Sequence, residues 1–179
     1  MRLKTVFMMV GFCAMSALSS SAMAQLWAKN CATNMCLDAT TGAVNGMVQV
    51  SDCAEYKIAQ QWHQNSPWGE GLQNAYEGFG KPCLDMNSET SVVTNACNKA
   101  LQAQSWTFVA NGQVGTLQNG YWNEGNQCAV VGDDNTVIAA KCDGSIAQNW
   151  YWVNVGDDAS CPEESRMKLP NQRMKLPTQ

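Results

Sequence analysis

Residue types that carry out acid–base, nucleophilic or metal chemistry are sparse in this chain of 179 residues. His63 is the only histidine, and it follows Trp62 in a polar stretch without a nearby nucleophile or metal ligand. The run Asp133-Asp134-Asn135 supplies oxygen ligands but lacks the spacing and the distal glutamate of a calcium loop, so it predicts a turn. No Ser-His-Asp set or Cys-His pair is apparent. We therefore expect a protein that is not an enzyme and holds no metal ion or cofactor.

Cysteine is the other reactive side chain, and the amino terminus decides how many cysteines remain. Residues 1–24 contain a positively charged start, an apolar stretch too short to span a membrane, and the cleavage pattern Ala22-Met23-Ala24. These features are typical of a secretory signal peptide that is cut before Gln25. Cleavage there removes Cys13 and leaves eight of the nine cysteines, an even number that predicts disulfide bonds in an exported protein. We expect a secreted or periplasmic protein.

The rest of the chain contains three copies of one repeat, which is the first pattern to look for in a sequence. The motif Gln-x-Trp occurs three times, with its tryptophans 44 residues apart both times. One cysteine precedes each motif at intervals of 44 and 45 residues, and another lies further upstream at intervals of 47 and 45. The first two upstream cysteines are followed by Leu-Asp. The lead-in segment Leu72-Gln73-Asn74-Ala75-Tyr76 recurs at residues 117–121, and we expect Leu26-Trp27 to be its first copy. The repeated residues are Cys36, Cys83 and Cys128; Cys53, Cys97 and Cys142; and Trp62, Trp106 and Trp150.

The repeat also predicts the disulfide pairing, which eight cysteines alone leave open among about 105 schemes. The two cysteines of each copy should pair with each other. Cys31 and Cys161 remain, one at each end of the domain. Domain termini often lie close together, and the first and last repeats of a closed threefold fold are neighbours, so we expect these two to pair as well. The predicted bonds are Cys36–Cys53, Cys83–Cys97, Cys128–Cys142 and Cys31–Cys161.

Local patterns in every copy predict short β-strands. Brief runs rich in β-branched residues, such as 47–50, 91–93 and 136–138, are separated by Gly, Asn and Asp. No stretch of residues 25–161 shows a sustained helical period. Several short strands in each of three copies favour an all-β, closed threefold architecture, because closure removes exposed strand edges.

The order Cys-Leu-Asp, a second cysteine 14 to 17 residues on, and Gln-x-Trp resembles the repeat of the ricin B-type lectins and related carbohydrate-binding modules. The resemblance covers roughly residues 25–155. It implies a β-trefoil of three lobes with pseudo-threefold symmetry, with the Gln-x-Trp tryptophans in a shared core. It also implies a secreted, non-catalytic carbohydrate-binding protein with one potential sugar pocket in each lobe, and glycans or glycoconjugates as partners.

In this family an aspartate binds adjacent sugar hydroxyls, an aromatic ring stacks on the pyranose, and amide side chains complete the site. The match here is partial, because the aromatic position holds Ser51 in lobe one and the expected asparagine is alanine in lobes one and two. Lobe three has Val130 and Ala140 in place of the carboxylate and the aromatic ring, so we expect it to be inactive. The carbohydrate-binding residues that the resemblance implies are Asp38, Gln49 and Gln60 in lobe one and Asp85 and Gln104 in lobe two.

Each of these side chains also has a structural interpretation. Asp38 and Asp85 can hydrogen-bond the backbone of a turn. The glutamines of Gln-x-Trp suit a structural role, since lobe three keeps Gln148 without its carboxylate. Gln49 can equally be an exposed strand residue.

Two further features concern ligands and partners. Trp68 and Trp122 lie outside the Gln-x-Trp motifs, near glycine-rich loops, and are candidates for contact with a ligand. The missing stacking residues favour an alternative function, in which the scaffold serves a bacterial toxin complex as a receptor-binding or accessory subunit.

Charge divides the chain into an acidic domain and a basic tail. Acidic residues outnumber lysines between residues 25 and 161, so little is available to neutralise phosphates and we expect no nucleic-acid partner. We also expect no transmembrane segment. Residues 162–179 contain a tandem seven-residue repeat, 166–172 and 173–179, with a proline in each copy. This composition predicts a disordered tail.

Overall fold

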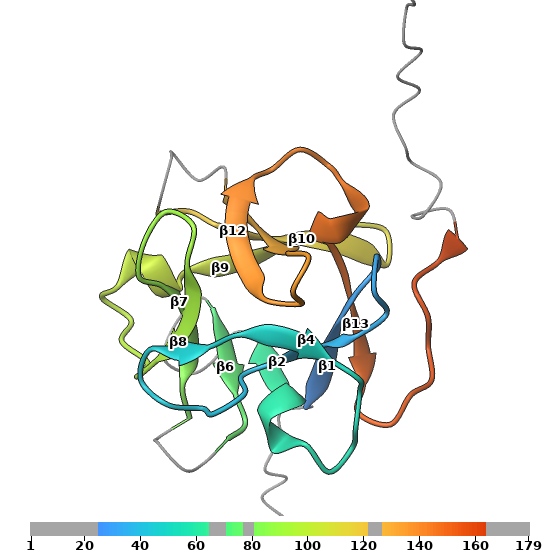
Figure 1. Ribbon diagram of the computed structural model, residues 1–179, viewed down its shortest axis with the longest axis horizontal. Helices are drawn as coiled ribbons and strands as arrows, with labels where there is room; N and C mark the ends of the chain where they lie inside the picture. Colours follow the sequence, from blue (N-terminus) through green and yellow to red (C-terminus); the bar gives the residue numbers. More distant parts are fainter. Residues whose placement is uncertain (1–24, 65–70, 77–80, 122–126, 164–179) are drawn as a thin grey trace, which may run out of the picture.

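The computed structural model describes residues 25–64, 71–76, 81–121 and 127–163, and in these ranges thirteen short strands form one antiparallel sheet (Figure 1). Lobe one contains β1 (Leu26–Asn30), β2 (Cys36–Asp38), β3 (Gly46–Met47), β4 (Gln49–Ser51) and β5 (Trp62–Gln64). Lobe two contains β6 (Leu72–Asn74), β7 (Cys83–Met86), β8 (Val92–Asn95) and β9 (Trp106–Asn111). Lobe three contains β10 (Val114–Asn119), β11 (Gln127–Val131), β12 (Val137–Lys141) and β13 (Asn149–Asn154). A 3₁₀ turn precedes the last strand of each lobe: η1 (Ile58–Gln60), η3 (Gln102–Gln104) and η5 (Ile146–Gln148).

This threefold arrangement is a β-trefoil, as the repeat predicts. Lobe one has a fifth strand because its third strand is interrupted at Val48. On one side of the interruption β3 pairs with β8 of the next lobe, and on the other β4 pairs with β2 of its own lobe. Within the described ranges, no helix is long and apolar enough to cross a membrane.

The three Gln-x-Trp tryptophans, Trp62, Trp106 and Trp150, lie in the central core with at most 3% of their surface exposed. Two of them also hold the lobe together by hydrogen bonds. Trp62 Nε1 donates to Leu37 O at 2.9 Å, and Trp150 Nε1 donates to Ala129 O at 3.0 Å. Each acceptor carbonyl belongs to the residue that follows the first repeat cysteine of its lobe, Cys36 or Cys128. Among the described residues, the buried Nε1 of Trp106 has no such partner.

This difference predicts unequal costs for one substitution at three equivalent positions. Trp62→Phe and Trp150→Phe should each lower the free energy of unfolding by about 1 to 2 kcal/mol more than Trp106→Phe, because they leave a buried carbonyl without its donor. Urea denaturation followed by circular dichroism measures all three. Equal losses at the three positions would show that the indole hydrogen bonds do not contribute.

A buried asparagine links each lobe to the one before it. Asn30, Asn74 and Asn119 are fully buried and occupy equivalent positions. Each Nδ2 donates to the carbonyl of the residue before a Gln-x-Trp glutamine, at 2.8 to 2.9 Å. Each Oδ1 accepts a hydrogen bond of 3.0 Å from the backbone amide two residues on. The acceptor carbonyls belong to Ala147, Ala59 and Ala103.

These contacts correct the expected first copy of the lead-in segment. Because Asn30 is the equivalent of Asn74, the segment that matches Leu72-Gln73-Asn74 is Ala28-Lys29-Asn30. The prediction that Leu26-Trp27 matches Leu72-Gln73 is therefore wrong, because Leu26 lies two residues before the true equivalent of Leu72. Only the asparagine is shared by all three copies, and that is too weak a signal to align the first copy from sequence.

Four disulfides connect the cysteines in the pairs that the repeat predicts: Cys36–Cys53, Cys83–Cys97, Cys128–Cys142 and Cys31–Cys161. The last of these joins the two ends of the domain, with Cα atoms 5.2 Å apart. Strands β1 and β13 lie side by side here and pair from Leu26 opposite Asn154 to Asn30 opposite Trp150 (Figure 1).

Lys29 adds a polar contact at the same closure. Its Nζ donates to Ala159 O at 2.6 Å and lies 5.8 Å from the centre of the Tyr151 ring. Burial lowers the pKa of Lys29, and the nearby charge of Asp158 partly opposes this shift. The first and last lobes are thus joined by a strand ladder, a disulfide and a buried lysine.

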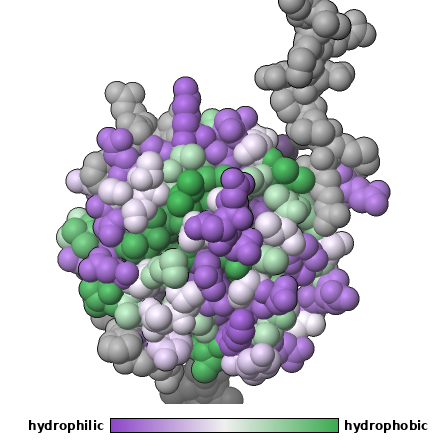
Figure 2. Space-filling model, in the orientation of Figure 1, coloured by the Kyte–Doolittle hydropathy of each residue, from purple (hydrophilic) through white to green (hydrophobic). Residues whose placement is uncertain are grey.

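The surface shows no single dominant character on the face in view. Figure 2 shows polar and apolar side chains interspersed there, with apolar groups gathering toward the side of β7 and β8. Exposed apolar side chains from the first and third lobes include Val44, Met47 and Ile138.

Candidate functional site

A pocket in lobe one contains two of the side chains that the sequence predicts for sugar binding. In the hairpin of β2 and β4, Asp38 pairs with Gln49, so both side chains lie on one face of the hairpin. They line a cavity of about 430 Å³. The other lining residues come from the loop after β2, from the loop after Cys53, from η1 and from the segment after β6: Thr40, Tyr56, Lys57, Ile58, Ala59 and Tyr76.

The carboxylate of Asp38 is 5% exposed and is held mainly through one of its oxygens. Asp38 Oδ2 accepts hydrogen bonds from Ser51 Oγ at 2.6 Å and from Gln60 Nε2 at 3.3 Å. Lys57 Nζ lies 3.8 Å from the same oxygen, and its side chain remains 38% exposed. These contacts fix the carboxylate in place and leave Oδ1 as the oxygen without a hydrogen bond among the described residues.

Ser51 occupies the position of the missing stacking aromatic, and its hydroxyl donates to Asp38 Oδ2 instead. Two aromatic side chains reach the pocket from elsewhere. Tyr56 is 84% exposed, and Tyr76 is half-buried. No motif marks Tyr56 in the sequence, because it lies between the repeat motifs and its equivalent in lobe two is Ala100.

The position of Tyr76 depends on Gly42, which has a φ of +57°. A Cβ atom on Gly42 would lie 2.4 Å from Cδ1 of the Tyr76 ring. Both the backbone conformation and the close approach of the ring therefore require glycine at this turn. The turn and the ring form one wall beside the pocket.

The Gln-x-Trp glutamines have the same surroundings in all three lobes. Gln60, Gln104 and Gln148 are buried, and each Oε1 accepts the backbone N–H that follows the second cysteine of its lobe, at 2.8 to 2.9 Å. Each Nε2 donates to the carbonyl that precedes this cysteine, at 2.8 to 3.0 Å. Because lobe three keeps both contacts without a carboxylate, they serve to hold the disulfide loop. Gln60 and Gln104 in addition donate to Asp38 and Asp85.

Asp85 in lobe two is 4% exposed, and protein donors occupy both of its carboxylate oxygens, in contrast to Asp38. Its Oδ1 accepts from Met86 N at 2.7 Å. Its Oδ2 accepts from Asn95 Nδ2 at 2.9 Å and from Gln104 Nε2 at 3.0 Å. Both oxygens therefore already have protein donors, which favours a structural role for the lobe-two carboxylate.

The remaining candidates are two tryptophans outside the motifs, the lobe-three hairpin and the single histidine. Trp68 and Trp122 lie outside the described residues, as do residues 1–24 and 164–179. In lobe three, Val130 pairs with Ile138, so the hairpin face has no carboxylate there. His63 is half-buried, and its Nδ1 is buried without a hydrogen-bond partner in the described part of the chain. The described residues contain no cluster of three or more metal-ligating side chains.

No protein-family model and no curated protein sequence matches the chain. Solved structures do match it. The β-trefoil lectin of the Vibrio vulnificus hemolysin/cytolysin, with N-acetyl-D-lactosamine bound, has a TM-score of 0.60 and 18% identity, covering 78% of this chain and 100% of that one. The designed threefold-symmetric protein ThreeFoil has a TM-score of 0.59 and 17% identity, covering 73% and 98%. The hemolytic lectin CEL-III has a TM-score of 0.57 and 25% identity, and the match covers 73% of this chain but 31% of that chain. These similarities show the β-trefoil fold.

The groups that line the lobe-one pocket are of the kinds that contact a neutral ring carrying hydroxyl groups. One carboxylate oxygen and the Gln49 amide offer acceptors and donors, and the tyrosine rings offer apolar faces. A solvent-exposed ammonium group, Lys57, lies at the edge of the same set.

Proposed function

We propose that this chain is a secreted, non-catalytic carbohydrate-binding protein of the ricin-type lectin kind, with its sugar site in the lobe-one pocket. The observation that carries the proposal is the pocket itself, which brings together Asp38, Gln49 and the ring of Tyr56. Asp38 and Gln49 are the residues that the repeat motif predicts. Tyr56 supplies the stacking surface that the motif position lacks, from an exposed loop.

The extracellular or periplasmic location is part of the same proposal. Four disulfides suit an oxidising compartment, and residues 1–24 have the composition of a signal peptide. Mass spectrometry of the exported protein would identify its first residue. We expect Gln25, and an exported chain that retains residues 1–24 would contradict the processing step.

Glycan binding by the exported protein and by two matched variants tests the site. Asp38→Asn should weaken binding ten- to hundredfold, because it removes the negative acceptor for sugar hydroxyls. Tyr56→Ala should weaken it about three- to tenfold through loss of ring stacking, and should leave folding intact because the side chain is exposed. A glycan array followed by calorimetry on the strongest ligand provides both measurements.

The control is Asp85→Asn, which makes the same chemical change at the equivalent and equally buried position of lobe two. We expect it to leave glycan binding within about twofold, because the protein already uses both oxygens of Asp85. Binding that is lost in Asp85→Asn and kept in Asp38→Asn would move the site to lobe two. An array without any bound glycan would remove the proposal altogether.

A second candidate is a receptor-binding or accessory subunit of a bacterial toxin. The observation that favours it is the structural similarity to lectin domains of a hemolysin/cytolysin and of a hemolytic lectin. Purification of the exported protein from native culture medium distinguishes the two functions. Co-purification of a second subunit in fixed stoichiometry favours the toxin complex, and a monomer that binds glycans at full strength contradicts it.

A further inference from the structure

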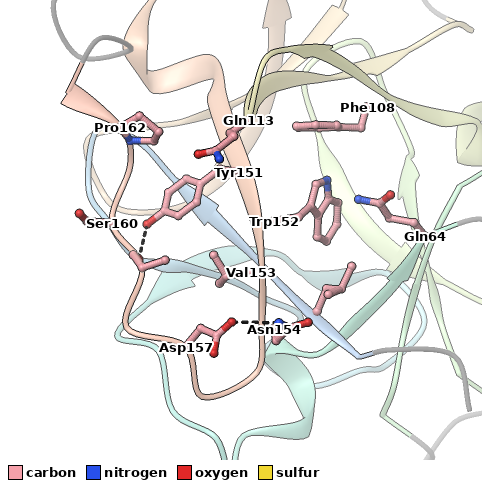
Figure 3. Close-up of a pocket in the computed structure, with 12 residues that line it drawn as sticks. Gln64, Phe108, Gln113, Tyr151, Trp152, Val153, Asn154, Asp157, Ser160 and Pro162 are labelled. Atoms are coloured by element: carbon pink, nitrogen blue, oxygen red, sulfur yellow. Dashed lines mark hydrogen bonds between the residues drawn. The ribbon is translucent and has the colours of Figure 1, made fainter.

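A second hollow lies where β1 begins and β13 ends, at one end of the barrel that the strands of the β-trefoil form around the tryptophan core (Figure 3). Its volume is about 580 Å³, within the range of small-molecule sites, and it shares no lining residue with the lobe-one pocket. The segment that follows β13 forms one wall. The side chains that matter for its chemistry are Gln64, Phe108, Gln113, Trp152, Asn154 and Asp157.

Three of these residues occupy one equivalent position in the three lobes. Gln64, Phe108 and Trp152 each follow a Gln-x-Trp tryptophan by two residues. Alternate residues of a strand share a face, so each of these residues lies on the same face as its tryptophan, two positions further along the strand. The tryptophan is buried in the core, and the residue two further on lines the hollow. This position holds an amide in lobe one, a phenyl ring in lobe two and an indole in lobe three. The mouth of the barrel is therefore not symmetric, although the core beneath it is.

The indole of Trp152 is held in a fixed orientation at this mouth. Its ring meets that of Phe108 edge to face, with centroids 6.0 Å apart and planes at 75°. Figure 3 shows Phe108 and Gln64 on neighbouring sides of the indole, with the indole nitrogen toward Phe108. Trp152 remains half-buried, so part of its ring borders the hollow. An ordered, partly exposed indole is a surface on which a flat apolar ligand face can stack.

The polar groups around the hollow are amides and one carboxylate. Asn154 Nδ2 donates to Asp157 Oδ2 at 2.9 Å, which orients the exposed carboxylate and leaves its other oxygen without a hydrogen bond among the described residues. Gln113 is exposed on the turn between β9 and β10. No lysine or arginine belongs to the described lining. Carboxylate and amide groups beside an indole suit a ring with vicinal hydroxyls on its edge and C–H groups on its face. An anionic ligand would be repelled by Asp157, because the buried Lys29 ammonium behind the lining already donates to Ala159 O.

We propose that this barrel mouth is a second carbohydrate-binding site, in which a neutral pyranose stacks on Trp152 and hydrogen-bonds Asp157. This proposal rests on the proposed function for its ligand class, but the two sites share no residue. An experiment can therefore refute either site and leave the other standing. The ligand contacts the end of the barrel, in contrast to the hairpin faces that form the lobe pockets.

Indole resonances of the full exported chain test this site directly. The Trp152 Nε1–Hε1 signal in ¹H–¹⁵N spectra is identified by its loss in Trp152→Phe. The probes are the methyl glycosides of galactose, N-acetylgalactosamine, glucose and mannose, each titrated to millimolar concentrations. We expect at least one probe to shift the Trp152 signal saturably in the wild-type chain and equally in Asp38→Asn, which alters only the lobe-one pocket.

Asp157→Ala should raise the dissociation constant measured at Trp152 about tenfold through loss of a charged hydrogen-bond acceptor. Asp133→Ala removes another exposed aspartate of the same charge and should change it less than twofold. The proposal is overturned if no probe shifts the Trp152 signal, or if the shift disappears in Asp38→Asn and persists in Asp157→Ala. If no glycan binds the lobe-one pocket of the wild-type chain but a probe still shifts the Trp152 signal, only the proposed lobe-one site is refuted.

Discussion

Replacing Cys31 and Cys161 together by alanine is expected to lower the free energy of unfolding by about 5 kcal/mol. This bond closes a loop with a sequence separation of 130, and in the chain-entropy model the stabilisation grows with the logarithm of loop length. Both sulfur atoms are buried in a small apolar cluster with Val114 and Tyr151, so the bond also keeps the carboxyl-terminal segment against the barrel. A domain of this size has a stability of about 5–15 kcal/mol, so the loss would leave little in reserve.

The matched comparison is the double variant Cys83→Ala with Cys97→Ala. That bond spans a separation of 14, for which the same model gives about 3 kcal/mol. Guanidinium denaturation without reductant, followed by tryptophan fluorescence, gives both values. Hydrogen exchange should also be faster in β1 when the terminal bond is absent, because the ladder between β1 and β13 then loses its covalent support. If the free energy of unfolding falls equally in the two double variants, the Cys31–Cys161 bond contributes no more than the bond within one lobe.

Sequence predicted the scaffold well because each copy of the repeat constrains the others. The spacing of cysteines and tryptophans identifies three equivalent lobes, and equivalence alone pairs six of the eight cysteines. The failure at Leu26-Trp27 has the same origin. The first lead-in segment keeps only the asparagine of its copies, and its true position is set by a hydrogen bond to Ala147 at the other end of the chain. A contact over a separation of 117 residues leaves no local pattern.

The site was predictable only in part, because its residues come from two kinds of structure. Asp38 and Gln49 belong to paired strands, where alternation of side chains places them on one face. Tyr56 and Lys57 belong to a loop whose backbone turns recur in lobe two, but Ala100 and Leu101 stand at their positions there. No repeated residue type therefore marks their approach to Asp38. The glutamines illustrate a different limit. Gln60 has the residue type of a sugar ligand, and only its backbone contacts show that it holds the disulfide loop.

The second large effect is expected at the asparagines that link the lobes. Asn74→Ala removes a donor to Ala59 O and an acceptor for Tyr76 N, both fixed by a side chain that is fully buried. Each lost hydrogen bond costs about 1 kcal/mol, and a buried group that stays without a partner costs about 1–3 kcal/mol more. We therefore expect the free energy of unfolding to fall by about 3 kcal/mol. Asn119→Ala should behave alike, because it breaks the same two contacts with Ala103 and Tyr121.

Asn98→Ala is the control for this effect. Asn98 Oδ1 also accepts a backbone N–H two residues on, from Ala100 at 3.0 Å, but the residue is exposed and water can replace the bond. It should cost less than about 1 kcal/mol. Urea denaturation of the three variants gives the comparison. Because the buried asparagines act between lobes, Asn74→Ala should also leave the disulfide loop of lobe one in place, held by Gln60. A loss in Asn74→Ala no larger than that in Asn98→Ala would show that strand pairing and the tryptophan core hold the lobes together without the asparagines.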